Sequence, residues 1–274
     1  MEKKKTKINL LAIQMCSEIA NVKANIKKVK TLLETYLNKQ SADFVFLPEV
    51  WTVGWDCESF QKNAETIDSA ESIKMLKQIA KKYYVNIIGG SFIEKKTDGT
   101  YANTCVVIDR KGELICTYEK NHLFSYYGCA EGDYITAGKN PVLVDIEGVK
   151  IGLSICYDIR FPEIYRAYRK AGSDILVNMA AWGADKKIPW DSMTTSRAVE
   201  NQTYFVALTQ TGKLRNGANL GHSMIIDYKG EILSEINKTE GGIYATIDLN
   251  EMYDFRNKCK ILNDIKNSYE VIIK

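Results

Sequence analysis

An internal repeat of a half-domain constrains the fold of this chain more than any other feature. Residues 107–114 read Val-Ile-Asp-Arg-Lys-Gly-Glu-Leu, and residues 225–232 read Ile-Ile-Asp-Tyr-Lys-Gly-Glu-Ile. Each segment predicts two strands joined by a tight turn, because apolar residues flank an Asp-x-Lys-Gly run. A repeat of this kind indicates that two similar structural units pack against each other.

The same order of strands and helices is predicted in both halves of the chain. In the first half, strands are expected at residues 8–13, 43–47, 85–88, 103–108 and 114–118, with apolar residues at helical spacing over 22–37 and 73–83. In the second half, strands are expected at residues 149–155, 174–178, 204–209, 223–226 and 231–236, with helices over 162–171 and 190–201. Both halves therefore follow the order β-α-β-α-β-β-β.

This order predicts an α/β fold with four layers. Each half makes a mixed sheet with its helices on one face, since a β-α-β crossover has a fixed handedness. Packing the two bare sheet faces together, with helices outside, gives an αββα sandwich with a pseudo-two-fold repeat. Two separate α/β domains are the alternative. Only residues 138–141 and a short hairpin strand lie between the halves, so we expect a single domain over residues 1–274.

Composition is that of an ordinary globular enzyme. The formal net charge of +3 is spread thinly, and the one basic cluster, Lys3-Lys4-Lys5, lies at the terminus, so no nucleic-acid partner is expected. No apolar run is long enough to span a bilayer, so no membrane association is expected either. The seven cysteines cannot all pair and none lies in a Cys-x-x-Cys spacing. This pattern argues against a disulfide framework or a zinc ribbon and favours the reducing cytoplasm.

A cysteine stands at the junction of a predicted strand and a predicted helix. The strand over residues 149–155 ends at Cys156, and Pro162 suits the first turn of a helix. Such a junction exposes the sulfur and lets the following backbone N–H groups face a thiolate or an oxyanion. The alternative is a buried cysteine that packs as a small apolar side chain.

Two charged residues also directly follow predicted strands, where ligands collect in parallel sheets. The Lys120 ammonium would favour a thiolate and, with the backbone N–H of Tyr157, would hold an oxyanion. Glu49 would take the thiol proton, pass it to the leaving amine and then activate water. Taken singly, each residue fits an exposed surface position better than a catalytic one, and it is their joint occurrence beyond strand ends that favours function. His122 and His222 have no acidic or amide partner that the sequence can place, so we interpret both as structural or pocket-lining.

The segments that contain these residues resemble the signature motifs of the nitrilase superfamily of carbon–nitrogen hydrolases. The motifs are Leu47-Pro48-Glu49, Lys120-Asn121-His122-Leu123-Phe124 and Cys156-Tyr157-Asp158-Ile159-Arg160-Phe161-Pro162-Glu163, and residues 196–202 and 221–223 resemble later family blocks. The resemblance covers nearly the whole chain. It implies a catalytic triad of Glu49, Lys120 and Cys156 on an αββα sandwich. We expect no metal and no organic cofactor, because a thiolate, a lysine and a carboxylate supply every proton and charge that the reaction needs.

The resemblance also implies a second glutamate between the lysine and the cysteine. Glu131, within residues 130–138, matches that position and is expected to orient the Lys120 ammonium and hold the substrate amide. Asp133 is the competing candidate. Two exposed loop acids without a catalytic role are the alternative.

The residues after the cysteine indicate a branch of the superfamily. True nitrilases usually follow the cysteine with Trp-Glu, and hydrolases of N-carbamoyl amino acids with Asn-Asp-Arg-Arg. The run of residues 157–161, Tyr-Asp-Ile-Arg-Phe, instead resembles the omega-amidases, which hydrolyse the terminal amide of 2-oxoglutaramate or 2-oxosuccinamate. We therefore predict a hydrolase that releases ammonia from a short dicarboxylic acid monoamide through a cysteine thioester. The alternatives are an N-carbamoyl-amine hydrolase, a nitrilase, or a catalytically silent scaffold on the same fold.

Such a substrate leaves a free carboxylate, for which Arg160 is the candidate because a guanidinium binds a carboxylate through two hydrogen bonds. A structural ion pair of Arg160 with Glu163 or a distant acid is equally consistent with the sequence. Residues 125–130 form a shorter loop than in animal omega-amidases, which leaves the length and charge of the substrate open. The remaining substrate-binding candidates are Tyr157 and three possible pocket walls, Phe124, Tyr126 and Trp182.

The resemblance finally implies a homodimer or a higher homo-oligomer. Members of the family usually pair through the helices after the cysteine and near Arg197. Three residues of these helices, Tyr165, Tyr168 and Ala198, would suit such a surface, although they could equally face their own sheet.

Overall fold

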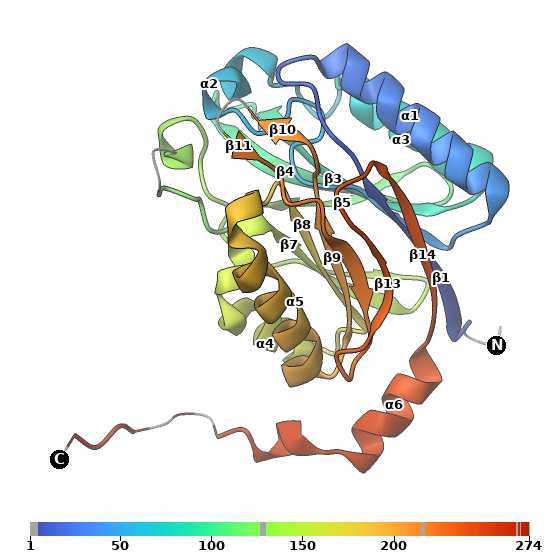
Figure 1. The fold of residues 1–274 in the computed structure, drawn as a ribbon, viewed down its shortest axis with the longest axis vertical. Helices are drawn as coiled ribbons and strands as arrows, with labels where there is room; N and C mark the ends of the chain where they lie inside the picture. The colour runs from blue at the N-terminus through green and yellow to red at the C-terminus, as the bar shows by residue number, and fades with distance from the viewer. Residues whose placement is uncertain (1–4, 127–129, 215–216, 267, 269, 274) are drawn as a thin grey trace.

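Two six-stranded sheets pack face to face, and helices cover the outer face of each (Figure 1). This arrangement, in a computed structural model, confirms the predicted αββα sandwich. The structure describes residues 5–126, 130–214, 217–266, 268 and 270–273. Lys3 and Lys4 of the basic cluster and residues 127–129 of the short loop lie outside the described residues.

The first sheet has the strand order β14-β1-β2-β3-β4-β5. Its central pairs β1–β2 and β2–β3 are parallel and its outer pairs are antiparallel. The helices α1 (Val22–Lys39) and α3 (Glu71–Tyr83) cover its outer face. Its strands are β1 (Lys7–Gln14), β2 (Phe44–Phe46), β3 (Asn86–Lys95), β4 (Tyr101–Ile108), β5 (Leu114–Glu119) and β14 (Gly241–Asp248).

The second sheet has the equivalent order β13-β12-β9-β8-β7-β6. Again the pairs β7–β8 and β8–β9 are parallel and the outer pairs are antiparallel. The helices α4 (Pro162–Lys170) and α5 (Lys187–Asn201) cover it. Its strands are β6 (Leu143–Ile146), β7 (Val149–Ile155), β8 (Ile175–Ala180), β9 (Tyr204–Thr209), β12 (Ser223–Ile226) and β13 (Ile232–Ile236).

The internal repeat persists in the hydrogen bonds of the two turns that revealed it. The Asp109 side chain accepts hydrogen bonds from the backbone N–H groups of Lys111 and Glu113, and Asp227 accepts the same pair from Lys229 and Glu231. Both hairpins also have a register shift one residue before the turn aspartate, between residues 107 and 108 and between residues 225 and 226. The sequence repeat therefore specifies the same bulged hairpin twice.

The C-terminal strand β14 was not expected from the sequence. It runs antiparallel to the whole of β1, from the pair Lys7 and Asp248 to the pair Gln14 and Gly241. It thereby occupies the place beside β1 that β6 occupies beside β7, although β6 reaches its neighbour through a hairpin. The smaller elements α2 (Cys57–Phe60), β10 (Lys213–Leu214), β11 (Gly217–Ala218) and α6 (Leu249–Lys258) were not predicted either.

The core has two layers, which the alternation of side chains in β1 separates. Leu10 and Ala12 face the second sheet, whereas Leu11 and Ile13 face α1 and α3. Because both faces of the sheet are buried, the strand is apolar at nearly every position. This packing fixes the sheets back to back and leaves the carboxyl ends of β2 and β7 at one edge of the sandwich.

The inner faces of α4 and α5 are buried against their own sheet. Tyr165 and Ala198 are fully buried and Tyr168 is 2% exposed. Of the two alternatives that the sequence left open for these three residues, the structure shows the second, because they pack on their own sheet and do not form a surface for a second subunit. Among the described helices, none has both the length and the apolar character needed to cross a membrane.

Candidate active site

The structure brings the predicted triad together at one edge of the sandwich, beside a pocket of about 720 Å³. Glu49 follows β2 and Lys120 follows β5 in the first sheet, and Cys156 follows β7 in the second sheet. Cys156 lines the pocket, whereas Glu49 and Lys120 lie behind it and are almost fully buried. Glu49 and Lys120 are thus in contact beyond the strand ends, and Cys156 lines the pocket beside them.

Lys120 bridges two buried glutamates. Its Nζ lies 2.9 Å from Oε1 of Glu49 and 2.9 Å from both carboxylate oxygens of Glu131. The same ammonium lies 5.0 Å from the centre of the Trp55 ring. A buried charge needs partners, and the two glutamate side chains supply them to this ammonium.

The Glu49 carboxylate is held on both oxygens. Besides Lys120, Oε1 accepts a hydrogen bond from Nδ2 of Asn103 at 3.0 Å, and Oε2 accepts one from the backbone N–H of Ala181 at 2.8 Å. Gln210 donates to the Glu49 backbone carbonyl. Asn103 and Gln210 were not among the predicted site residues, because neither lies in a motif that the sequence distinguishes from ordinary strand residues.

Glu131 lies in the predicted place. It is fully buried, and its Oε2 also accepts a 2.6 Å hydrogen bond from the backbone N–H of Phe124. Its own N–H donates to the Phe124 carbonyl at 3.0 Å, which fixes the two loop segments together. Asp133 is exposed at the pocket wall. The burial and the contacts distinguish the two acids, which the sequence left open.

Cys156 has a left-handed backbone conformation, with φ of 47°. This conformation costs a non-glycine residue on the order of 1–3 kcal/mol and persists only where neighbouring contacts impose it. Asn178 supplies one such contact, since its Nδ2 donates to the Cys156 carbonyl at 3.3 Å. A 3₁₀ helix, Cys156–Arg160, begins at the cysteine, so the α-helix α4 starts only at Pro162. The turn that follows the sulfur directly is therefore the 3₁₀ helix and not α4.

Electrostatics keep the resting cysteine in the thiol form. Burial raises the pKa of the Cys156 thiol well above its usual value, and Glu49 raises it further while Lys120 lowers it. Burial alone would lower the pKa of Lys120, but Glu131 and Glu49 outweigh burial and hold that pKa well above its usual value. Burial also raises the pKa of Glu131, against the charge of Lys120. The sulfur therefore needs a base to accept its proton.

Four of the five predicted substrate-binding candidates line the pocket: Tyr157, Arg160, Phe124 and Trp182. Arg160 is exposed, and its guanidinium carbon lies 5.3 Å from the Trp182 ring centre and 5.9 Å from that of Tyr157. No acidic side chain among the described residues pairs with it, Glu163 included. Tyr126 does not line the pocket but packs on the Phe124 and Tyr157 rings. Arg160 thus brings a positive charge to the pocket wall without an ion pair to any described acidic residue.

Both histidines have acidic partners that the sequence could not place. Nδ1 of His122 lies 2.8 Å from Oδ1 of Asp158. His222 lies between Asp191, 2.7 Å from its Nδ1, and Glu235, 2.9 Å from its Nε2. Neither histidine lines the pocket. Within the described ranges, no group of three or more His, Cys, Asp or Glu side chains is placed to hold a metal ion.

Comparisons with known proteins agree with this geometry. Residues 11–257 match the family model of carbon-nitrogen hydrolases. The chain belongs to the carbon–nitrogen hydrolase family. This carbon–nitrogen hydrolase is 36% identical to the 2-oxoglutaramate amidase of Bacillus subtilis (strain 168) over 242 residues. The aligned residues cover 88% of this chain and 91% of that protein.

Two further proteins extend the comparison. The chloroplastic omega-amidase of Arabidopsis thaliana is 34% identical to this carbon–nitrogen hydrolase over 254 residues, 89% of this chain and 68% of that protein. The crystal structure of Saccharomyces cerevisiae Nit3, a member of branch 10 of the nitrilase superfamily, matches with a TM-score of 0.86 at 26% identity. That match covers 93% of this chain and 94% of the yeast chain. The resemblance to the nitrilase superfamily is confirmed.

Proposed function

We propose that this carbon–nitrogen hydrolase is an omega-amidase, which releases ammonia from a short dicarboxylic acid monoamide such as 2-oxoglutaramate or 2-oxosuccinamate. The observation that carries the proposal is the buried lysine held between two glutamates behind a pocket that Cys156 lines. Relatives named 2-oxoglutaramate amidase and omega-amidase, at 36% and 34% identity, support the choice of substrate.

In the first half of the reaction, Cys156 attacks the amide carbon. Because the pKa of its thiol is raised by burial, the proton must leave as the S–C bond forms, and Glu49 accepts it. The carbonyl oxygen becomes an oxyanion, which the Lys120 ammonium and the backbone N–H of Tyr157 stabilise. Glu49 then gives the proton to the amide nitrogen and the C–N bond breaks. Ammonia departs, and the acyl group stays bound to the sulfur as a thioester.

In the second half, Glu49 activates a water molecule. It takes one proton from the water as the oxygen attacks the thioester carbon, and it returns that proton to the sulfur as the C–S bond breaks. The products are a carboxylic acid and the restored thiol. Glu131 keeps Lys120 protonated and directed at the oxyanion throughout, since it contacts the ammonium through both of its oxygens.

Arg160 is proposed to select the carboxylate at the far end of the substrate. Its guanidinium lies at the pocket wall without an acidic partner in the described part of the chain. A guanidinium and a carboxylate form two parallel hydrogen bonds, which fix the orientation of the bound amide as well as its charge. The Trp182 and Tyr157 rings, within cation–π distance of the guanidinium, help to hold it at the pocket wall.

We further propose that residues 1–274 form one domain, that the protein is cytoplasmic and that it forms homodimers. Pairing of β14 with β1 across the chain supports a single domain. Free thiols at Cys16, Cys105, Cys116, Cys156 and Cys259 support a reducing compartment. Exposed Ile188 and Val199 on α5 support a subunit contact through that helix. Light scattering after gel filtration measures the mass of the assembly, and a monomer at micromolar concentration would contradict the dimer.

The proposed function is tested by measuring ammonia release from a panel of short amides, together with mass spectrometry of the intact protein quenched during turnover. We expect ammonia from 2-oxoglutaramate and an acyl adduct on Cys156. The Cys156→Ala variant should give neither while melting at a temperature close to that of the wild type.

Other results would assign another activity. Folded wild-type protein that releases no ammonia from any monoamide would overturn the amidase assignment. Carbon dioxide from an N-carbamoyl substrate would indicate an N-carbamoyl-amine hydrolase, and turnover of a nitrile would indicate a nitrilase. Absence of an adduct with every substrate class would leave a catalytically silent scaffold.

A further inference from the structure

A buried carboxylate next to the site, Asp158, has no part in the proposed chemistry but accepts four hydrogen bonds. Its Oδ1 accepts from the backbone N–H and the ring Nδ1 of His122, at 2.9 and 2.8 Å. Its Oδ2 accepts from the Tyr118 hydroxyl at 2.6 Å and from the Ile155 backbone N–H at 2.9 Å. Burying a carboxylate costs free energy unless hydrogen bonds compensate for the lost water. These four donors therefore stabilise the buried Asp158 side chain.

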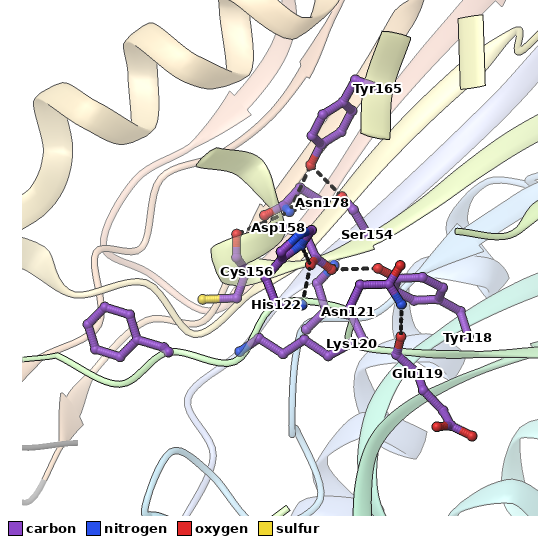
Figure 2. A network of polar contacts seen from close by, with 12 residues as sticks. Tyr118, Glu119, Lys120, Asn121, His122, Ser154, Cys156, Asp158, Tyr165 and Asn178 are labelled. Atoms are coloured by element: carbon purple, nitrogen blue, oxygen red, sulfur yellow. Dashed lines mark hydrogen bonds and ion pairs between the residues drawn. The ribbon is translucent and has the colours of Figure 1, made fainter. Parts of the chain in front are cut away.

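The residues that supply the four donors flank Lys120 and Cys156, and Figure 2 shows two of them, Tyr118 and His122, beside Asp158. Tyr118 and His122 lie two positions before and two positions after Lys120. Ile155 directly precedes Cys156, and Asp158 belongs to the 3₁₀ helix that begins at that cysteine. One carboxylate therefore joins the chain segment that carries the lysine to the turn that carries the nucleophile.

Backbone pairing does not make this connection. Lys120 follows β5 in the first sheet, and Cys156 follows β7 in the second sheet. Strands of different sheets share no ladder of hydrogen bonds, so side-chain contacts between the sheets set the distance from the ammonium to the sulfur. The left-handed conformation of Cys156 also needs contacts that impose it, and the Asp158 bond to the Ile155 N–H is one of them.

We propose that Asp158 is a positioning residue, which holds the backbones of Lys120 and Cys156 at the separation that thioester formation requires. This inference rests on the proposed function of those two residues. A displacement of about 1 Å in reacting groups costs on the order of 100-fold in rate. Loosening the Asp158 link should therefore lower kcat much more than it changes KM.

Three variants remove the link in different ways. Tyr118→Phe removes one donor, and His122→Phe removes the ring donor but keeps an aromatic ring to stack on Phe161, whose ring centre lies 3.6 Å away. In Asp158→Asn, one backbone N–H faces an amide N–H whichever way the amide is turned, since the Ile155 and His122 N–H groups approach different oxygens.

Tyr204→Phe is the matched control. Its buried hydroxyl exchanges hydrogen bonds with the Asp248 backbone at 3.0 and 3.2 Å, at the start of β9 and away from the site. This variant loses a buried tyrosine hydroxyl, as Tyr118→Phe does, but leaves Asp158 intact. Melting temperature, kcat, KM and the rate of Cys156 alkylation by iodoacetamide are measured for all four variants and the wild type.

We expect kcat to fall about tenfold or more in each of the three test variants, with KM changed less than kcat, and alkylation to slow in parallel. Tyr204→Phe should lower the melting temperature as much as Tyr118→Phe does while keeping the wild-type kcat. The proposal would be overturned if Tyr118→Phe and His122→Phe had the same kcat and the same alkylation rate as the wild type, even if Asp158→Asn fails to fold. Wild-type protein without amidase activity would instead reject the proposed function, and the alkylation rates would still decide the positioning role.

Discussion

Replacing Glu131 by glutamine is expected to separate activity from stability. Lys120 contacts both oxygens of Glu131 at 2.9 Å, and the Phe124 N–H contacts one of them. A glutamine oxygen can keep the Phe124 contact, but its amide N–H₂ then faces the ammonium. The variant thus loses one charge-assisted hydrogen bond, worth about 1.5–3 kcal/mol. Lys120 is left paired with Glu49, which draws the ammonium away from the oxyanion and towards the base.

If that loss falls on the transition state, kcat/KM should drop about 10- to 150-fold, since each 1.36 kcal/mol is tenfold in rate. Stability should change far less. Burial raises the pKa of Glu131, so this carboxyl favours folding only at low pH, and that contribution is lost as the pH rises through its folded pKa. At neutral pH, replacing the Glu131 carboxyl removes the free-energy cost of burying its charge, and this gain offsets the weaker pairing of Lys120. We therefore expect the free energies of unfolding of the wild type and Glu131→Gln to agree within about 1 kcal/mol.

The assays are ammonia release and urea denaturation at several pH values. Lowering the pH should raise the free energy of unfolding of the wild type relative to Glu131→Gln, because only the wild type gains a proton there on folding. The control is Glu71→Gln, which removes an exposed glutamate 3.0 Å from Lys74 and should change neither property. Unchanged kcat/KM in Glu131→Gln, or a loss of several kcal/mol in its stability, would refute the reasoning.

Three further predictions follow from the pocket, a turn and a thiol. Arg160→Met should raise KM for 2-oxoglutaramate about tenfold but not for a short uncharged amide, and an equal rise for both would contradict carboxylate binding. Gly112→Ala should lower the urea-unfolding free energy by about 1–2 kcal/mol at wild-type activity, because φ is 78° and a Cβ would meet the Lys77 carbonyl at 2.8 Å. Burial raises the pKa of Cys116 from 9.0 to about 11, so its contribution to stability is present below pH 9 and lost as the pH rises towards 11. Unfolding free energies of the wild type and Cys116→Ala should therefore converge above pH 9, and a constant difference would reject this explanation.

Local patterns were enough to predict the elements of both half-domains. The strand over residues 8–13 and the helix over residues 22–37 correspond to β1 and α1, because the first is a short, nearly continuous apolar run and the second has apolar residues at the helical period of 3.6. The missed strand β14 begins with two glycines, Gly241 and Gly242, which weaken a strand pattern. It forms because β1 has an edge that only a distant segment covers.

The residues of the site divide in the same way. Glu49, Lys120 and Cys156 could be predicted because each occupies a short motif directly after a strand, a relation that the sequence contains. Asn103 and Asp158 could not be assigned a function, since their importance depends on partners far away in the chain. Asn103 reaches Glu49 across 54 positions, and Asp158 reaches Tyr118 across 40.

The sequence by itself determined the repeated β-α-β order and the four layers that follow from it, and it placed the lysine, glutamate and cysteine of the proposed chemistry directly after strands. Only the tertiary structure decided that Glu131 rather than Asp133 is buried on Lys120, that Arg160 lines the pocket without an acidic partner among the described residues, and that Asp158 joins the two sheets. The physical reason is that periodicity and turn residues act between neighbours in the chain. Burial and charge pairing depend on how two separately formed sheets pack, which no local pattern records.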